Sequence, residues 1–284
     1  MTTGINVLGV LRVEQGNQDV TPSAPRKRQL FALLTLSPNI AISTDRLIEE
    51  IWPEGVPGTA LPTIQTYVYE IRRALQRSAD PTGSTPLSIE TQGDGYALRM
   101  DPNDLDCTRF EALLTEGRKQ QAKSSPAVVA TMMTDAIACW QGEAYSGVRR
   151  TRALEARARY LGEQRRQAFE LKVDSYLATG QHRQVIGELK ELSFSEPAHE
   201  WVEGRLMVAL AGCGRRTEAL EVYQAHRSYV RDKLGLEPSQ HMVDLQHRIL
   251  SGTLGNRTPA LRPTAGANTS AASSVTTLPI GGAA

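Results

Sequence analysis

The sequence predicts an α+β amino-terminal part, a winged helix-turn-helix with a small amino-terminal sheet, followed by an all-α part of tetratricopeptide-like helices. Three observations carry this prediction. Two amphipathic segments between residues 43 and 78 flank a turn rich in glycine and proline. A glycine-containing hairpin sequence follows them directly. In the second half, Gly180 and Gly214 lie 34 residues apart between helical patterns.

The first twenty residues predict short strands. The apolar residues of a strand-like run are Ile5, Val7, Val10, Leu11 and Val13. Val20 is placed in a second strand across a turn at Gly16-Asn17. A helix over residues 26–36 follows, which begins with a basic cluster and continues into apolar residues. We therefore expect a small sheet ahead of the first helix.

Residues 43–78 predict a helix-turn-helix. Thr44 and Asp45 open a short amphipathic helix, which Trp52-Pro53 ends before a turn with Gly55, Pro57 and Gly58. A second helix runs from about Thr59 to Ser78. Its buried stripe recurs at three- and four-residue steps and consists of Ile64, Tyr67, Val68, Ile71 and Leu75. This stripe leaves outside Thr63, Thr66, Tyr69, Glu70 and Arg73.

The exposed set has the chemistry that reads duplex DNA. A guanidinium pairs with guanine in two-pronged fashion, a carboxylate accepts from cytosine, and hydroxyls serve phosphates or bases. An ordinary surface helix has such a face as well, so the helix alone leaves both interpretations open. Residues 87–90 and 96–100 read as two strands around the turn Thr91-Gln92-Gly93-Asp94-Gly95. A helix pair followed by such a hairpin is typical of a winged helix.

After a linker at Asp101-Pro102-Asn103 the pattern is helical. Asp106 is expected to cap one helix, and Ser125-Pro126 to open another that runs to Gly142. When Gly180 is aligned with Gly214, the apolar positions of two helix pairs match. This period is typical of tetratricopeptide repeats, and we interpret the matched residues as packing positions. A closing helix starts at Ser239, and residues 253–284 are expected to form a disordered tail because they contain few large apolar residues.

The most basic stretch contains Arg149, Arg150, Arg152, Arg157, Arg159, Arg165 and Arg166. One interpretation is a solvated helix face, because Glu155 and Glu163 are interspersed. The other is an accessory surface that touches DNA phosphate or an acidic patch of RNA polymerase.

The order of these elements carries a family resemblance. Strands, then helices at PRKRQLFALLTL, STDRLIEEIWPE and TALPTIQTYVYEIRRAL, then a wing ending in GDGYAL resemble the DNA-binding domain of the Streptomyces antibiotic regulatory protein family. The remainder is similar to that family's bacterial transcriptional activation domain. The resemblance covers residues 5 to about 252 and implies a DNA-binding domain over 1–100 and an activation domain over 105–252.

The resemblance also implies a function. It implies a pathway-specific activator of secondary-metabolite clusters that binds direct repeats in double-stranded DNA as a homodimer and recruits RNA polymerase holoenzyme. The base contacts carried over by position are Thr63, Thr66, Tyr69, Glu70 and Arg73. The phosphate contacts carried over are Arg28, Arg46, Trp52, Arg72 and Tyr96. Two residues depart from the family pattern and place acidic charge near DNA, Glu70 in the helix and Asp94 in the wing.

The composition of the chain is compatible with DNA binding but does not by itself support it. The formal net charge of the chain is +1, and residues 1–100 hold nine Lys or Arg against ten Asp or Glu, so the basic footprint usual for DNA binding is missing. Instead of a net positive charge, this part of the chain has two basic clusters. They are Arg26, Lys27 and Arg28 at one helix start, and Arg72, Arg73 and Arg77 along another helix. An interaction module that no longer reads DNA therefore stands as the alternative.

Enzymatic function finds little support. The five histidines and three cysteines show no usual metal-ligand spacing, and we expect neither metal nor cofactor. Neither a phosphate-binding loop nor a dinucleotide-binding motif is present. The absence of a signal peptide pattern and of a long apolar run predicts a soluble, cytoplasmic protein with no membrane partner.

Overall fold

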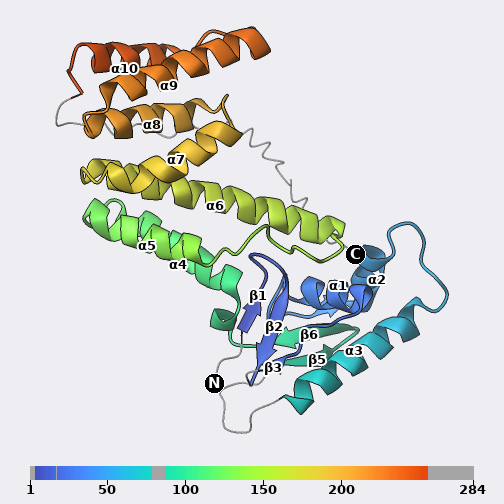
Figure 1. The fold of residues 1–284 in the computed structure, drawn as a ribbon. Coiled ribbons are helices and arrows are strands. Elements are labelled where there is room, and N and C mark those ends of the chain that lie inside the picture. The colour runs from blue at the N-terminus through green and yellow to red at the C-terminus, as the bar shows by residue number, and fades with distance from the viewer. Residues whose placement is uncertain (1–3, 17, 79–86, 255–284) are drawn as a thin grey trace, which may run out of the picture.

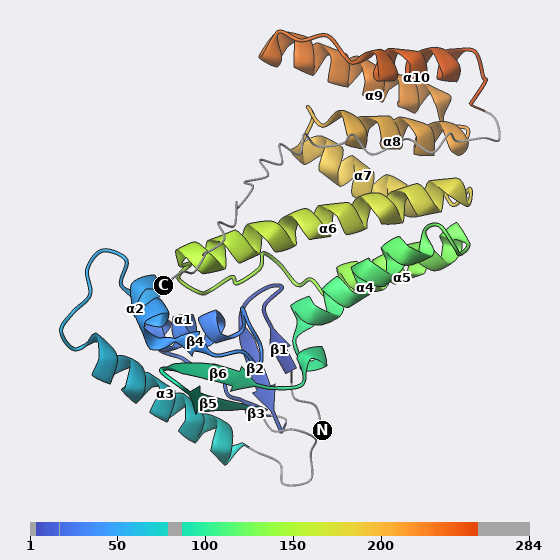
Figure 2. The same cartoon turned by 180° about the vertical axis from the view of Figure 1, so that it is seen from behind.

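The computed structural model describes residues 4–16, 18–78 and 87–254. Within these ranges the strands and the first three helices gather at one end, and the later helices stack in series away from them (Figures 1 and 2). The tail expected to be disordered lies outside the described residues from residue 255 onward. No helix in the described ranges is long and apolar enough to cross a membrane.

The amino-terminal sheet is antiparallel, in the order β1-β2-β3. Its strands are β1 (Gly4–Asn6), β2 (Arg12–Gln15) and β3 (Gln18–Asp19). Ile5 pairs with Val13, and both side chains are buried. Val20 lies directly after β3, and its amide donates to the Val13 carbonyl at 2.9 Å. The small sheet predicted from the sequence is thus confirmed.

Three helices follow, and the first two have starts that their sequences favour. They are α1 (Pro25–Leu34), α2 (Thr44–Ile51) and α3 (Ala60–Arg77). Pro25 occupies the first turn of α1, where its missing N–H costs nothing. The Ser43 hydroxyl accepts from the Arg46 amide and caps α2. The apolar stripe of α3 is buried as predicted except for Tyr67, which is half-buried, and the polar face is turned outward.

The wing consists of β5 (Ser88–Gln92) and β6 (Gly95–Arg99) around a turn in which Gly93 has a φ of 57°. A strand that the sequence did not predict, β4 (Ile42–Ser43), pairs with β6 and gives the order β4-β6-β5. A strand of two residues is too short to show the alternation of apolar and polar side chains from which strands are predicted. Gly95 permits this pairing, because a Cβ there would lie 2.2 Å from the Ile42 carbonyl oxygen.

The expectation that Asp106 caps the next helix is wrong. Asp106 is the first residue of α4 (Asp106–Gln120), and its carboxylate instead accepts hydrogen bonds from the Val7 and Leu8 amides at 2.9–3.0 Å. Burial raises the pKa of this carboxyl. Ser125 does accept from the Ala127 amide, although α5 (Pro126–Ala138) ends before the expected Gly142.

The predicted tetratricopeptide-like pairs are present. The remaining α-helices are α6 (Arg152–Ala178), α7 (Arg183–Ser195), α8 (Glu200–Gly212), α9 (Arg216–Tyr229) and α10 (Gln240–Leu250). Gly180 and Gly214 have φ of 74° and 78° in the turns after α6 and α8, a conformation that favours glycine. A π-helical turn (Val230–Leu234) and Gly235, with a φ of 66°, lead to α10. Helix α10 packs against α8 and α9 and closes the stack.

The side chains form two apolar cores that meet within α6. One extends from Ile5 through α1 to α5 to Ala168, and the second runs from Val173 to Ile249. The winged part and the first helices after the linker therefore share one core. Tyr145, which is fully buried, donates its amide to the Val7 carbonyl at 2.7 Å. Helix α6 is about 40 Å long and connects both cores.

Candidate nucleic-acid interface

The exposed face of α3 forms the candidate reading surface. The five residues predicted to contact bases lie on the side of α3 opposite its buried stripe. Tyr69 exposes 61% of its surface, whereas Thr63 is half-buried. Helix α3 runs along the edge of the molecule that is remote from α9 and α10 (Figures 1 and 2). An exposed helix of this kind fits the width of the major groove.

The polar groups on this face differ in how they are held. The hydroxyls of Thr63 and Thr66 donate to the carbonyls four residues earlier, at 2.6 and 2.9 Å, which leaves their lone pairs outward. Glu70 forms an ion pair with Lys27 of α1. No ion pair of Arg73 is present among the described residues, so its guanidinium is available to a base or phosphate.

The ion pair with Lys27 changes the effect that Glu70 is expected to have near DNA. Its charge is balanced by a cation from another helix, and the pair presents both a donor and an acceptor beside the reading face. Sequence reasoning placed Lys27 only in a basic cluster. The two residues are 43 positions apart, and no local pattern connects them.

Arg72 braces α3 against the wing. Its Nε donates to the Ile89 carbonyl at 2.7 Å and its Nη2 to the Thr91 hydroxyl at 2.8 Å. Its guanidinium also lies 5.8 Å from the centre of the Tyr96 ring. Tyr96 is 8% exposed. Arg72 and Tyr96 thus have a structural role where α3 meets the wing, in addition to the phosphate contacts predicted for them.

Trp52 at the end of α2 stacks with an arginine of α1. Trp52 is largely buried at the C-cap of α2, and the guanidinium of Arg26 lies 5.1 Å above its ring. Such stacking holds a cation in place while its outer edge stays exposed. The sequence places Arg26 in a basic cluster but not among the predicted contacts, and its position beside Trp52 adds it to them.

The remaining two predicted phosphate contacts lie in different surroundings. Arg46 is exposed in the first turn of α2. Arg28 is turned toward the helical part, where its guanidinium donates to the carbonyls of Pro22 at 3.0 Å and Gly147 at 3.3 Å. The position of Arg28 indicates a contact between the winged part and the loop before α6.

The arginine-rich stretch is extensively ion-paired. The pairs formed are Arg150 with Glu143 and Glu155, Arg157 with Glu111, Arg159 with Glu155, and Arg166 with Glu196. Arg165 lies 4.9 Å above the ring of Trp140. These contacts agree with the solvated-face interpretation for most of the stretch. Arg149 is in the loop before α6 and Arg152 begins the helix, and both side chains are near the surface.

The described residues contain no cluster of three His, Cys, Asp or Glu that could hold a metal ion. The three cysteines are unpaired, and burial raises the pKa of Cys107 to about 11, which keeps its thiol protonated.

Comparison with known proteins agrees with this picture. The family model described as bacterial transcriptional activator domain matches residues 105–250, and that described as transcriptional regulatory protein, C terminal, matches residues 18–98. The regulatory protein DnrI of Streptomyces peucetius is 31% identical over 253 residues, covering 88% of this chain and 93% of DnrI.

Two further relatives are longer than this chain. The regulatory protein AfsR of Streptomyces griseus is 32% identical over 257 residues, which cover 90% of this chain and 25% of AfsR. The structure of EmbR of Mycobacterium tuberculosis in complex with a low-affinity phosphopeptide superposes with a TM-score of 0.76 at 27% identity. That match covers 88% of this chain and 65% of the EmbR chain.

Proposed function

The chain belongs to the Streptomyces antibiotic regulatory protein family and is a transcriptional activator, and we propose that it reads operator DNA with the exposed face of α3. One observation carries the proposal: a polar helix face is held beside a fixed wing. Arg72 ties α3 to β5, while Tyr69 and Arg73 stay exposed. In this mode the side chains of α3 contact base edges, and Arg26 and Arg46 contact phosphates at the flank.

The operator consists of direct repeats bound by two copies of the chain. The first hundred residues hold nine basic and ten acidic side chains, so a single copy gains little from non-specific attraction to DNA. A second copy, or RNA polymerase holoenzyme, converts two weak contacts into one stable complex. Head-to-tail binding on one face of the duplex sets the repeats about one helical turn apart.

RNA polymerase is contacted through the helical part. The core shared by the winged part and α4 to α6 supports this role, because a rigid junction fixes the helical surfaces relative to the operator. The regulated genes on this proposal belong to a secondary-metabolite cluster, and the protein acts in the cytoplasm.

Selection of sites from a random duplex DNA pool tests the proposal at fixed salt concentration. The wild type should enrich a repeated motif. Arg73→Ala should bind that motif more weakly by roughly 1–3 kcal/mol and relax one base position. Arg183→Ala, which removes an exposed arginine at the start of α7, serves as the matched control and should behave as the wild type.

Two results would contradict the proposal. Unchanged site preference in Arg73→Ala would remove α3 from base reading. If the wild type enriched no motif even with RNA polymerase present, the helical part would carry the function as an interaction module.

A further inference from the structure

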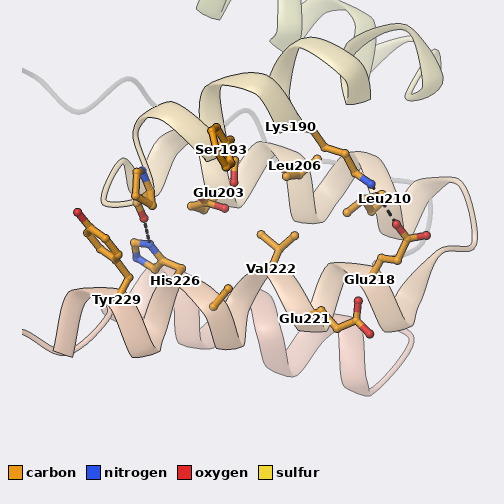
Figure 3. A pocket seen from close by; sticks show the side chains of 13 residues that line it. Lys190, Ser193, Glu203, Leu206, Leu210, Glu218, Glu221, Val222, His226 and Tyr229 are labelled. Carbon is orange, nitrogen blue, oxygen red and sulfur yellow. Dashed lines mark hydrogen bonds and ion pairs between the residues drawn. The ribbon is translucent and has the colours of Figure 1, made fainter. Parts of the chain in front are cut away.

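A groove of about 550 Å³ lies in the carboxy-terminal half, far from the reading face of α3. Side chains of α7, α8 and α9 converge on it, with Leu206 and Leu210 of α8 between the other two helices (Figure 3). This volume is in the range of ligand-binding clefts, and stacked helix pairs use such concave surfaces to hold partners. The DNA-binding role leaves the groove unused.

One end of the groove holds a buried histidine. The His226 side chain is 0% exposed, and its Nδ1 lies 3.0 Å from the Pro197 carbonyl oxygen. Because a carbonyl only accepts, Nδ1 carries a proton in this contact. Nε2 has no hydrogen-bond partner among the described residues and lies 3.7 Å from a carboxylate oxygen of Glu200. His226 therefore closes this end of the groove.

A buried carboxyl lies in the same groove. Glu203 of α8 is 3% exposed, and burial raises the pKa of its carboxyl although Ser193 donates to it. A cation entering the groove would stabilise the ionised carboxylate. Glu203 thus favours a ligand with a positively charged donor.

The rim adds negative charge. Lys190 and Arg215 both pair with Glu218, at 3.1 and 2.6 Å. Glu221 is exposed on the same wall and has no ion pair among the described residues. Among the residues that line the groove, one lysine, Lys190, therefore stands against the three carboxyl groups of Glu203, Glu218 and Glu221, so the lining is formally negative.

The mouth of the groove is apolar. Phe194 at the end of α7 exposes 91% of its surface, the largest fraction of any large apolar side chain described, and Tyr229 of α9 exposes 37%. A concentration of exposed apolar side chains beside a cleft marks an interaction site.

We propose that this groove binds a peptide segment of a partner protein in which a lysine or arginine is flanked by large apolar side chains. The cationic group donates to the carboxylate of Glu203. The flanking apolar side chains pack against Phe194 and Tyr229. The site is separate from the reading face of α3, so its occupancy and DNA binding are measured independently.

An array of immobilised random decapeptides, probed with the full chain, tests the site. Bound peptides should be enriched in a basic residue flanked by leucine or aromatic residues. An enriched peptide, labelled with fluorescein, then gives dissociation constants. Phe194→Ala and Glu221→Lys should each weaken binding about tenfold, since both residues are exposed and their substitution leaves the core intact.

Glu191→Lys makes the same charge change at an exposed position of α7 outside the groove and should leave peptide affinity unchanged. Glu203→Gln should lower the preference for basic peptides without changing binding to operator DNA. Absence of any enriched class, preference for acidic peptides, or equal weakening by Glu191→Lys and Glu221→Lys would each overturn the proposal.

Discussion

The Nε of Arg72 donates a 2.7 Å hydrogen bond to the backbone carbonyl of Ile89, and this bond fixes α3 against the wing. The neighbouring residue, Arg73, has no described ion pair and faces outward. Two adjacent arginines therefore have different tasks: one holds the reading helix in position, and the other is available to DNA.

This division predicts opposite phenotypes for two neighbouring substitutions. Arg72→Ala removes the bonds to Ile89 and Thr91 and should lower the free energy of unfolding by about 1–2 kcal/mol. Arg73→Ala should leave stability unchanged and weaken specific DNA binding. Urea unfolding followed by circular dichroism, with fluorescence anisotropy on operator DNA, measures both quantities. A larger stability loss in Arg73→Ala than in Arg72→Ala would contradict the assignment.

The carboxylate of Asp106 joins the amino-terminal sheet to the first activation-domain helix. Asp106→Asn keeps one acceptor oxygen but places an amide donor opposite backbone N–H groups. We expect a loss of about 1–3 kcal/mol of unfolding free energy, because a buried donor then lacks a partner. Urea unfolding at neutral pH measures it, with Asp101→Asn as an exposed control in the linker.

The same carboxyl predicts a pH dependence. Its pKa in the folded state is raised above the ordinary value of 3.8, so the folded state binds more protons than the unfolded state between these two values. The contribution of Asp106 to stability therefore increases as the pH falls through that window and is constant below 3.8. The stability difference between wild type and Asp106→Asn should grow in this direction, and a difference that shrinks on acidification would contradict the shift.

Gly95 is predicted to be indispensable for the wing. A Cβ at this position would lie 2.2 Å from the Ile42 carbonyl oxygen and 2.7 Å from its carbon, which are backbone atoms that a rotamer change cannot move. Gly95→Ala should therefore separate β4 from β6 and lower the free energy of unfolding by about 1–3 kcal/mol. Gly58→Ala, in open space, is the control. Equal melting temperatures for both variants would disprove the close approach.

The sequence predicts the helices well because their signals are local. Ser43 and Ser125-Pro126 mark helix starts by their own hydrogen bonds, and the stripe of α3 follows from three- and four-residue spacing. The small strand β4 escapes such reasoning, because its pairing with β6 depends on residues about fifty positions later. Local patterns therefore define elements but not how the elements meet.

The candidate interface shows the same limit. The outward position of Tyr69 and Arg73 follows from periodicity, whereas the ion pair of Glu70 with Lys27 and the stacking of Arg26 on Trp52 require the tertiary structure. The role of Asp106 was misread for the same reason, since its partners Val7 and Leu8 are about a hundred residues away. Charge and residue type identify candidates, and packing decides their partners.

Within the arginine-rich stretch, Arg157 is held by Glu111. Arg157 forms a two-pronged pair with Glu111, at 3.0 and 2.7 Å, and only 26% of its side chain is exposed. Arg157→Glu places two carboxylates together and should lower the free energy of unfolding by about 2–4 kcal/mol. Adding Glu111→Arg should restore much of that loss. Unfolding curves of the single and double variants measure this coupling.

The ion pair of Arg157 with Glu111 determines how a loss of transcriptional activation in a charge-reversal variant should be interpreted. Charge reversal at Arg157 impairs a promoter assay through stability alone, so it does not test a surface for DNA or RNA polymerase. Arg149→Glu and Arg152→Glu alter residues outside the described ion pairs and should leave the unfolding free energy within about 0.5 kcal/mol of wild type. If these two variants reduce transcription while binding operator DNA normally, the start of α6 contacts polymerase. If transcription is unchanged, the stretch is a solvated face held together by its own ion pairs.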